Sequence, residues 1–156
     1  MKKSKNFEPI LIGIFASLII GFLAFLSFET STGFWLMFSF GSTTLIVLIF
    51  YESEFSQPRN IFFGHLLGIF IGVIFNIYFG MSFITLGLAV GLTITLMIYF
   101  KVIHPPAAAN PLIALFSDVS FEYIISPVIT GTIVIIILSY IVNKIILKRN
   151  FPKKWL

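Results

Sequence analysis

The sequence predicts an all-α polytopic membrane protein with about six membrane segments, arranged as two three-segment inverted repeats whose middle segments are interrupted or half-helical. Two observations carry this prediction. Of the 156 residues, 58% are hydrophobic and only 10% are charged, whereas soluble domains carry about 25% charged residues. Apolar stretches also recur along the whole chain at lengths near the roughly 20 residues of a membrane helix. We therefore expect residues 1–156 to form a single transmembrane domain, with no length left for a second domain.

Six apolar segments follow one another, and the second and fifth are broken. The segments are Ile10 to Phe28, Phe34 to Tyr51, Ile61 to Phe79, Met81 to Phe100, Phe100 to Phe116 and Tyr123 to Leu147. Polar and small residues from Ser39 to Thr44 interrupt the second segment, and a His-Pro-Pro run beginning at His104 interrupts the fifth. The stretch that remains to form a helix is Ala107 to Phe116. As a helix it would be about 15 Å long, half the hydrocarbon thickness. We therefore expect helices that restart near Gly41 and near Pro106.

A shift of 66 residues lays 10–75 over 76–141 without a gap, which predicts a first repeat at 10–75 and a second at 76–147. Each half contains a long span, an interrupted span, an acidic loop and another long span. Three crossings per half would invert the second half relative to the first, as in many transporters. The starts of the two interrupted helices would then face each other near the membrane midplane. The alternative is four full spans with segments two and five re-entrant.

Basic residues gather in and beside the tails 1–9 and 148–156. Eight of the ten lysines and arginines are terminal: Lys2, Lys3, Lys5, Lys144, Lys148, Arg149, Lys153 and Lys154. Cytoplasmic loops carry an excess of such residues, so we expect a multi-pass protein of the cell (inner) membrane with both termini in the cytoplasm. Lipid headgroups account for the basic tails, and no nucleic-acid partner is expected. The run Ile10 to Phe28 is long for a signal peptide, and Ser31-Thr32-Gly33 is a weak cleavage site, so we expect a retained span.

The sequence HPPAAANPL, from His104 to Leu112, is the strongest local pattern. Proline suits the first turn of a helix, and the alanines extend the helix and permit close packing. A helix start inside the membrane presents backbone N–H groups and a partial positive charge, which an anion would satisfy. His104 precedes this start, and Asn110 lies one turn inside it. The alternative is a kink stabilised by its neighbours, with His104 hydrogen-bonded to a carbonyl.

A second pattern, FSQPRN from Phe55 to Asn60, leads into the third segment. Arg59 is one of only two basic residues outside the termini, and its guanidinium fork suits planar oxyanions. An alternative of equal weight is that Arg59 reaches lipid headgroups or pairs with Glu52 or Glu54. His65 follows between one and two turns later, and ionisable residues inside a membrane are functional candidates.

Glycines recur at every fourth residue in the third and fourth segments, at Gly64, Gly68 and Gly72 and again at Gly87 and Gly91. Small residues at this spacing let helices approach backbone to backbone, so packing is the first interpretation and a narrow conduit the second. Hydroxyl groups between Ser39 and Thr43 would either line a polar path or bond back to their own helix.

These patterns together resemble the HPP family of integral membrane proteins, named after the His-Pro-Pro motif. The resemblance rests on FGSTTLIVLIF, SQPRNIFFGHLLG and HPPAAANPL, in that order, and covers about Ile10 to Leu147. It implies four or more membrane spans, and an association of plastid and cyanobacterial members with nitrite transport. It also implies importance, without a defined role for each, of His104, Pro105, Pro106, Gln57, Pro58, Arg59, Asn60, Gly64 and His65.

The expected function is a membrane transporter or channel for a small inorganic anion such as nitrite, bound between the facing helix starts. The candidate binding residues are His104, Pro105, Pro106, Ala107, Ala108, Asn110, Gly41, Ser42, Thr43, Gln57, Arg59, Asn60 and His65. If uptake is coupled to a proton gradient, His104 or His65 would carry the proton. The expected partners are the anion, the lipid bilayer, protons and further copies of the chain in a homo-oligomer, with no cofactor and no metal.

The alternative function is a non-transporting membrane scaffold or assembly protein. An enzyme is not expected, because the sequence has no HExxH or GxSxG motif, no paired intramembrane carboxylates and no cysteine.

Overall fold

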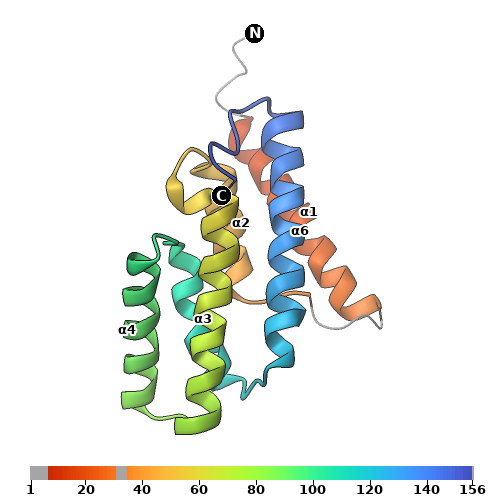
Figure 1. Ribbon diagram of the computed structural model, residues 1–156. Coiled ribbons are helices and arrows are strands. Elements are labelled where there is room, and N and C mark those ends of the chain that lie inside the picture. Colours follow the sequence, from red (N-terminus) through yellow and green to blue (C-terminus); the bar gives the residue numbers. More distant parts are fainter. Residues whose placement is uncertain (1–6, 31–34, 156) are drawn as a thin grey trace.

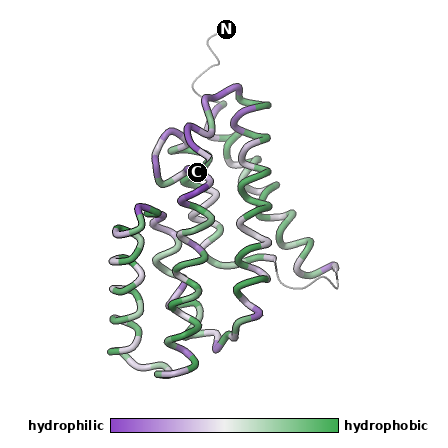
Figure 2. Tube along the Cα trace, viewed as in Figure 1, coloured by the Kyte–Doolittle hydropathy of each residue, from purple (hydrophilic) through white to green (hydrophobic). Residues whose placement is uncertain are grey.

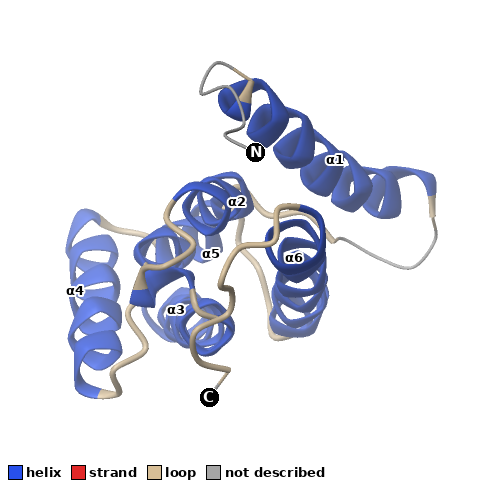
Figure 3. Ribbon diagram, turned by 90° about the horizontal axis from the view of Figure 1, so that it is seen from above, coloured by secondary structure: helices blue, strands red, loops and turns tan. Residues whose placement is uncertain are grey.

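The computed structural model describes residues 7–30 and 35–155 (Figure 1), and every regular element in these two ranges is a helix (Figure 3). The predicted all-α class is therefore confirmed. The N-terminal lysines up to Lys5, the weak cleavage site at 31–33 and Phe34, the expected start of the second segment, lie outside the described residues.

The first half of the chain forms a long helix, a short helix and a second long helix. These are α1 (Glu8–Glu29), α2 (Ser39–Ile49) and α3 (Pro58–Phe79), with a short 3-10 turn, η1 (Glu54–Ser56), before α3. Proline lies in the first turn of both α1 and α3, where its missing N–H needs no intrahelical partner. α3 ends at Gly80, whose φ of 66° is accessible to glycine at little cost.

The second half repeats this order, but its helices are more often interrupted. α4 is Phe83–Tyr99, and a 3-10 segment, η2 (Pro105–Ala109), leads directly into α5 (Asn110–Phe116). The last helix has three parts, η3 (Ile124–Ile129), α6 (Thr130–Tyr140) and η4 (Ile141–Ile146), of which η3 and η4 are π-helical. Ser126, before Pro127, has non-helical angles, because a residue that precedes proline avoids the helical region.

Within residues 7–30 and 35–155, three helices are long and apolar enough to cross a membrane: α1, α3 and the composite last helix Ile124–Ile146. α4 is shorter, at 17 residues. α2 has 11 residues, so it is about 16 Å long and covers roughly half the hydrocarbon thickness. The expected half-helices are therefore present at α2 and at η2 with α5, while the number of crossings, four or six, stays a prediction.

Two of the three elements of each half match in the register that the sequence predicts, whereas α1, moved to 74–95, covers the end of α3, Gly80 and most of α4. Moved by 66 residues, α2 falls on 105–115, against η2 and α5 at 105–116, and α3 falls on 124–145, against the last helix at 124–146. α2 and α5 start beside each other, since the Ser39 hydroxyl donates to Asn110 Oδ1 over 2.9 Å. α2 then runs towards Arg149 near the chain termini, whereas α5 runs towards Asp118, which accepts from Asn76 near the end of α3. This is the arrangement expected of inverted repeats.

Charged residues divide between the two ends of this bundle, and Figure 2 shows hydrophobic residues along the helices between them. Arg149 pairs with Glu8 at 2.7 Å, which places the end of the last helix beside the start of α1. Every described lysine and arginine lies at or beyond a helix end on this side of the bundle. The loop after α5, at the opposite side, carries Asp118 and Glu122.

The two glycine stripes differ in their surroundings. A Cβ atom built on Gly68 would lie 2.5 Å from the Ala107 carbonyl oxygen, and Gly64 and Gly72 are similarly close to η2 and α5. Packing is therefore the correct interpretation for this stripe. It lets α3 touch residues 102–116, which we call the HPP region, backbone to backbone. By contrast, nothing lies within 4 Å of a Cβ built on Gly87 or Gly91.

Candidate functional site

Five polar side chains meet where α2 and α5 start, inside an otherwise apolar core. Ser39 and Thr43 belong to α2, His65 to α3, and Asn110 to α5, while His104 immediately precedes η2. All five are buried, and all except Ser39 have no exposed surface. We call these five residues the polar cluster. Because buried polar atoms without partners are costly, their hydrogen bonds decide what the cluster can do.

Asn110 joins the two halves of the chain within this cluster. Its Oδ1 accepts from the Ser39 hydroxyl at 2.9 Å, and its Nδ2 donates to both the carbonyl oxygen and Nδ1 of His65, each at 3.0 Å. The carbonyl can only accept, which fixes the orientation of the amide. Nδ1 of His65 is therefore an acceptor, and the proton of this imidazole lies on Nε2.

His104 carries its proton on the opposite nitrogen. Its Nδ1 lies 2.7 Å from the Phe55 carbonyl oxygen, and because a carbonyl only accepts, Nδ1 must donate. The expected carbonyl bond of His104 is thus present, but Nε2 remains directed at Thr43. The imidazole centroids of His65 and His104 are 4.9 Å apart, and Phe40 packs edge-on against His65.

The Thr43 hydroxyl bridges the two imidazoles. Its Oγ1 lies 2.8 Å from Nε2 of His65, 3.0 Å from Nε2 of His104 and 3.0 Å from the Ser39 carbonyl oxygen. With neutral rings, His65 donates to the hydroxyl and the hydroxyl donates to His104. A continuous series of donors and acceptors therefore runs from the Ser39 side chain through the polar cluster to the Phe55 carbonyl.

A hollow of about 410 Å³ opens beside the starts of α2 and α5. Ser39, Ser42 and Ser117 line it, so we call it the serine hollow. Its other lining residues are Phe38, Ala109, Leu112, Ile113 and Phe116. Ser39 both lines this hollow and donates to Asn110, which connects the hollow to the polar cluster. The lining carries no charged side chain, and within the described ranges no three His, Cys, Asp or Glu residues are grouped to hold a metal ion.

The start of η2 differs from expectation, because it lacks the backbone donors that were predicted to hold an anion. Pro105 and Pro106 have no N–H, and the N–H of Ala107 donates to the His104 carbonyl at 3.0 Å. The prediction that an anion contacts backbone donors at Pro105, Pro106 and Ala107 was wrong, since proline removes the donors that a helix start otherwise leaves free. Ala108 and Gly41, also predicted, are not in the lining of the serine hollow.

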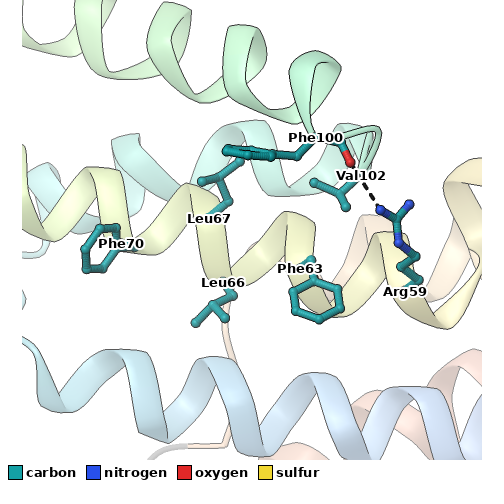
Figure 4. Close-up of a pocket in the computed structure, with 7 residues that line it drawn as sticks. All are labelled: Arg59, Phe63, Leu66, Leu67, Phe70, Phe100 and Val102. Atoms are coloured by element: carbon teal, nitrogen blue, oxygen red, sulfur yellow. Dashed lines mark hydrogen bonds between the residues drawn. The ribbon is translucent and has the colours of Figure 1, made fainter. Parts of the chain in front are cut away.

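Arg59 is not part of the polar cluster but caps α4, and Figure 4 shows its guanidinium directed at the Phe100 carbonyl. Its Nη1 donates to the Lys101 carbonyl at 2.7 Å and its Nη2 to the Phe100 carbonyl at 3.2 Å. Carbonyls at a helix C-terminus lack intrahelical partners, and a cation there complements the helix dipole. Arg59 therefore fastens the end of α4 to α3, in place of the expected pairing with Glu52 or Glu54, while its contact with an anion stays a prediction.

Asn60 supports the HPP region in the same way. Its Nδ2 donates to the Ile103 carbonyl at 3.0 Å. Arg59 bonds to the carbonyls of residues 100 and 101, and the Phe55 carbonyl accepts from His104. The FSQPRN motif thus holds the chain that leads into η2. Asn60 and Arg59, both predicted as binding residues, thus position His104 from outside the cluster.

Gln57, another predicted binding residue, fastens the C-terminal tail. Its Oε1 accepts from the backbone N–H groups of Lys153 and Lys154 at 2.7 and 3.2 Å, and its Nε2 donates to two carbonyls in the connection between α2 and α3. Nearby, Lys153 pairs with Glu52 at 3.2 Å. This hydrogen bond and the positive charge of Lys153 lower the pKa of Glu52.

Two residues at the end of α2 escaped the sequence analysis. Asn143 Nδ2 donates to the Val47 carbonyl at 3.1 Å, and Arg149 Nη1 donates to the Leu48 carbonyl at 2.7 Å. Arg149, which the sequence suggested was only a tail charge, thus caps α2 as Arg59 caps α4. Partners of this kind are backbone carbonyls, which leave no signal in the sequence.

Comparison with known proteins identifies a family and two relatives. The family described as HPP, transmembrane region, matches residues 2–152. Two transmembrane proteins of Dictyostelium discoideum are each 30% identical to the chain, one over 75% of the chain and 44% of its own length, the other over 77% and 41%. The chain therefore spans less than half the length of these relatives. No solved structure matches it significantly.

The family match includes all three motifs that the packing of α2, α3 and η2 brings together. With three helices long and apolar enough to cross a bilayer, the chain is a membrane protein that belongs to the HPP transmembrane-region family.

Proposed function

We propose that this protein is a transporter or channel that carries a small inorganic monovalent anion, such as nitrite, through the serine hollow. The observation that supports this best is the meeting of two half-helix starts at an uncharged hollow lined with hydroxyl groups. Non-helical backbone at membrane depth is tolerated where it is buried in protein or lines a polar cavity. The choice of nitrite rests on the resemblance described above, because the names of the matched relatives carry no substrate.

The start of α2 supplies the electrostatic attraction in this proposal. A helix N-terminus has N–H groups without intrahelical partners and a partial positive charge. Ser39 and Ser42 lie in the first turn of α2 and line the hollow. Ser42 donates to the Ser39 carbonyl over 3.2 Å, a long bond that its hydroxyl can exchange for a bond to an anion. An anion in the hollow would therefore meet donors without meeting a carboxylate.

The lining of the hollow favours small monovalent anions over larger or divalent ones. Leu112, Ile113 and Phe116 supply apolar walls, and the lining has no cation to compensate a second negative charge. Removing a charge from water into such surroundings is costly unless partners replace the water. The Ser39 hydrogen is already donated to Asn110, so the hydroxyls of Ser42 and Ser117 and a helix dipole are left as partners. These partners are weak, which also suits rapid release.

The same proposal includes the cell membrane as location, with both termini in the cytoplasm. Support comes from the basic side of the bundle, where the described lysines and arginines gather near both chain ends. A homo-oligomer is also proposed, because only 11% of the membrane window of α1 is buried within one chain. Light scattering of the detergent-solubilised protein would give the number of copies.

A non-transporting scaffold is the second candidate. The observation that favours it is that the hydrogen bonds of the polar cluster are complete without a ligand. A measurement of anion flux by the purified protein separates the two functions, because a scaffold has no flux of its own.

The decisive experiment compares Ser42→Ala with Thr95→Ala in purified protein reconstituted into lipid vesicles. Thr95 is exposed on α4, and its hydroxyl also bonds within its own helix, to the Gly91 carbonyl at 2.9 Å, so this variant matches the loss of a local hydroxyl bond. Nitrite efflux is followed at neutral and at alkaline pH, and protein-free vesicles at each pH correct for uncharged nitrous acid that leaks through the lipid.

We expect the unchanged protein and Thr95→Ala to carry nitrite faster than protein-free vesicles. Ser42→Ala should bind nitrite about 10- to 100-fold more weakly, because a hydrogen bond to a charged ligand contributes about 1.5–3 kcal/mol. Equal flux in both variants would reject the serine hollow as the site. Flux no higher than in empty vesicles would leave the scaffold function.

A further inference from the structure

The polar cluster has two complete hydrogen-bond arrangements on the same heavy atoms, and these differ by one proton. With both imidazoles neutral, two hydrogens lie between the three central atoms. Nε2–H of His65 donates to Thr43 Oγ1, and the Thr43 hydroxyl donates to Nε2 of His104. The outer nitrogens are fixed by Asn110 and by the Phe55 carbonyl, so this direction is the one that satisfies both rings.

One added proton on Nε2 of His104 fits without moving any heavy atom. Both Nε2–H groups then donate to Thr43 Oγ1, which has two lone pairs to accept them. The Thr43 hydroxyl turns its own hydrogen to the Ser39 carbonyl oxygen, which already lies 3.0 Å away. Every donor again has an acceptor, and the rotation of one hydroxyl is the whole change.

A second added proton has no place in the cluster. It would have to bind Nδ1 of His65, where Asn110 Nδ2 already donates at 3.0 Å. Turning the Asn110 amide over would present its oxygen to Nδ1, but it would also set that oxygen against the His65 carbonyl oxygen, which can only accept. The geometry therefore limits the cluster to one proton.

A positive charge on this pair requires a negative partner that the described side chains do not supply. The groups that face the rings are Thr43 and Phe40 from α2, Asn110 from α5 and the Phe55 carbonyl. In residues 7–30 and 35–155, no Lys, Arg, Asp or Glu forms a hydrogen bond or ion pair with either imidazole. A buried charge without a partner is strongly unfavourable. An anion in the serine hollow, which Ser39 lines and connects to the polar cluster, would be that partner.

We propose that the polar cluster binds one proton together with the anion in the serine hollow, so that one proton crosses the membrane with each monovalent anion. This inference rests on the proposed anion transport and names its second substrate. Proton and anion together are electrically neutral. A pH gradient would therefore drive the transport, whereas a membrane potential would not.

Nitrogen NMR tests the proton site directly. The chain has two histidines, so protein labelled with ¹⁵N-histidine and purified without a histidine tag reports on this cluster alone. Without nitrite at neutral pH, we expect the Nε2–H form of His65 and the Nδ1–H form of His104. Saturating nitrite should convert one ring, His104, to imidazolium. Two neutral rings under saturating nitrite would overturn the proposal.

A pair of adjacent variants tests the role of the Thr43 hydroxyl. Thr43→Val removes this hydroxyl at nearly constant volume. Thr44→Val is the matched control, because Thr44 is equally buried and its Oγ1 has no hydrogen-bond partner. Thr43→Ser keeps the hydroxyl and guards against a general effect of changing this position.

The readout is the nitrite dissociation constant as a function of pH. If one proton binds with each anion, the dissociation constant rises tenfold per pH unit wherever the free cluster is neutral, because linkage is reciprocal. The unchanged protein, Thr44→Val and Thr43→Ser should show this slope, and Thr43→Val should lose it. Equal slopes in Thr43→Val and Thr44→Val would overturn the proposal.

The two proposals fail in different ways. Nitrite binding and flux that do not change with pH would reject the proton and leave the anion transport intact. Absence of nitrite binding and flux at every pH would reject both.

Discussion

Replacing Gly68 by alanine should loosen the contact between α3 and the HPP region. The new Cβ would lie 2.5 Å from the Ala107 carbonyl oxygen and 3.2 Å from Asn110 Cβ. Both neighbours belong to packed helical segments, so the helices must separate to admit the methyl group. Overpacking of this kind costs about 1–3 kcal/mol. Separation would also pull Asn110 away from His65 and weaken the polar cluster.

Gly91→Ala provides the control for this substitution. Gly91 also lies inside a helix, but nothing lies within 4 Å of a Cβ built there. Both variants gain the helix propensity of alanine, up to about 1 kcal/mol. The difference between them therefore isolates the steric cost, and Gly68→Ala should be the less stable variant by about 1–3 kcal/mol.

The assay is reversible unfolding in mixed micelles, with helix content followed by circular dichroism as the fraction of denaturing detergent rises. We expect Gly91→Ala to unfold at or above the midpoint of the unchanged protein and Gly68→Ala clearly below it. Coincident midpoints for the two variants would refute the assignment of the first glycine stripe to close packing.

Three other changes test the polar bonds of the structure. Asn110→Leu keeps the shape of the side chain but leaves the buried Ser39 hydroxyl and Nδ1 of His65 without their partner. The same unfolding assay should therefore show a loss of about 2–5 kcal/mol in the free energy of unfolding. A loss below about 1 kcal/mol would contradict the role of Asn110. Arg59→Gln uncaps α4, and amide hydrogen exchange should accelerate at the end of that helix; unchanged exchange would argue against capping. Because Lys153 lowers the pKa of Glu52, their contact stabilises the tail above the usual pKa of a glutamate, and this contribution is lost as the pH falls through the lowered value. Trp155 fluorescence should report that release in acid, and Glu52→Gln should abolish the transition.

The half-helices could be predicted because proline and short apolar length are local properties of the sequence. Pro105 and Pro106 set a helix start, and the ten residues after them are too few to cross a membrane. Polar and small residues from Ser39 to Thr44 predicted a second start near Gly41, and α2 begins at Ser39. The meeting of the two starts followed from inverted topology alone.

The roles of individual polar residues could not be predicted, because their partners are mostly backbone carbonyls. An arginine fork fits two helix-end carbonyls as well as it fits an anion, so Arg59 looked like a ligand although it is a cap. Glycine spacing has a similar limit. The same four-residue repeat occurs in α3 and α4, but spacing does not reveal which face meets a neighbour, and Gly91 proves to be open.

Anomalous diffraction from crystals soaked in bromide, a monovalent anion with a strong signal, tests the central claim most directly. If small anions enter between the two half-helix starts, the strongest bromide peak should lie in the serine hollow, in contact with the hydroxyl of Ser42. Strong peaks confined to the basic side of the bundle, in protein that still transports nitrite, would contradict the account.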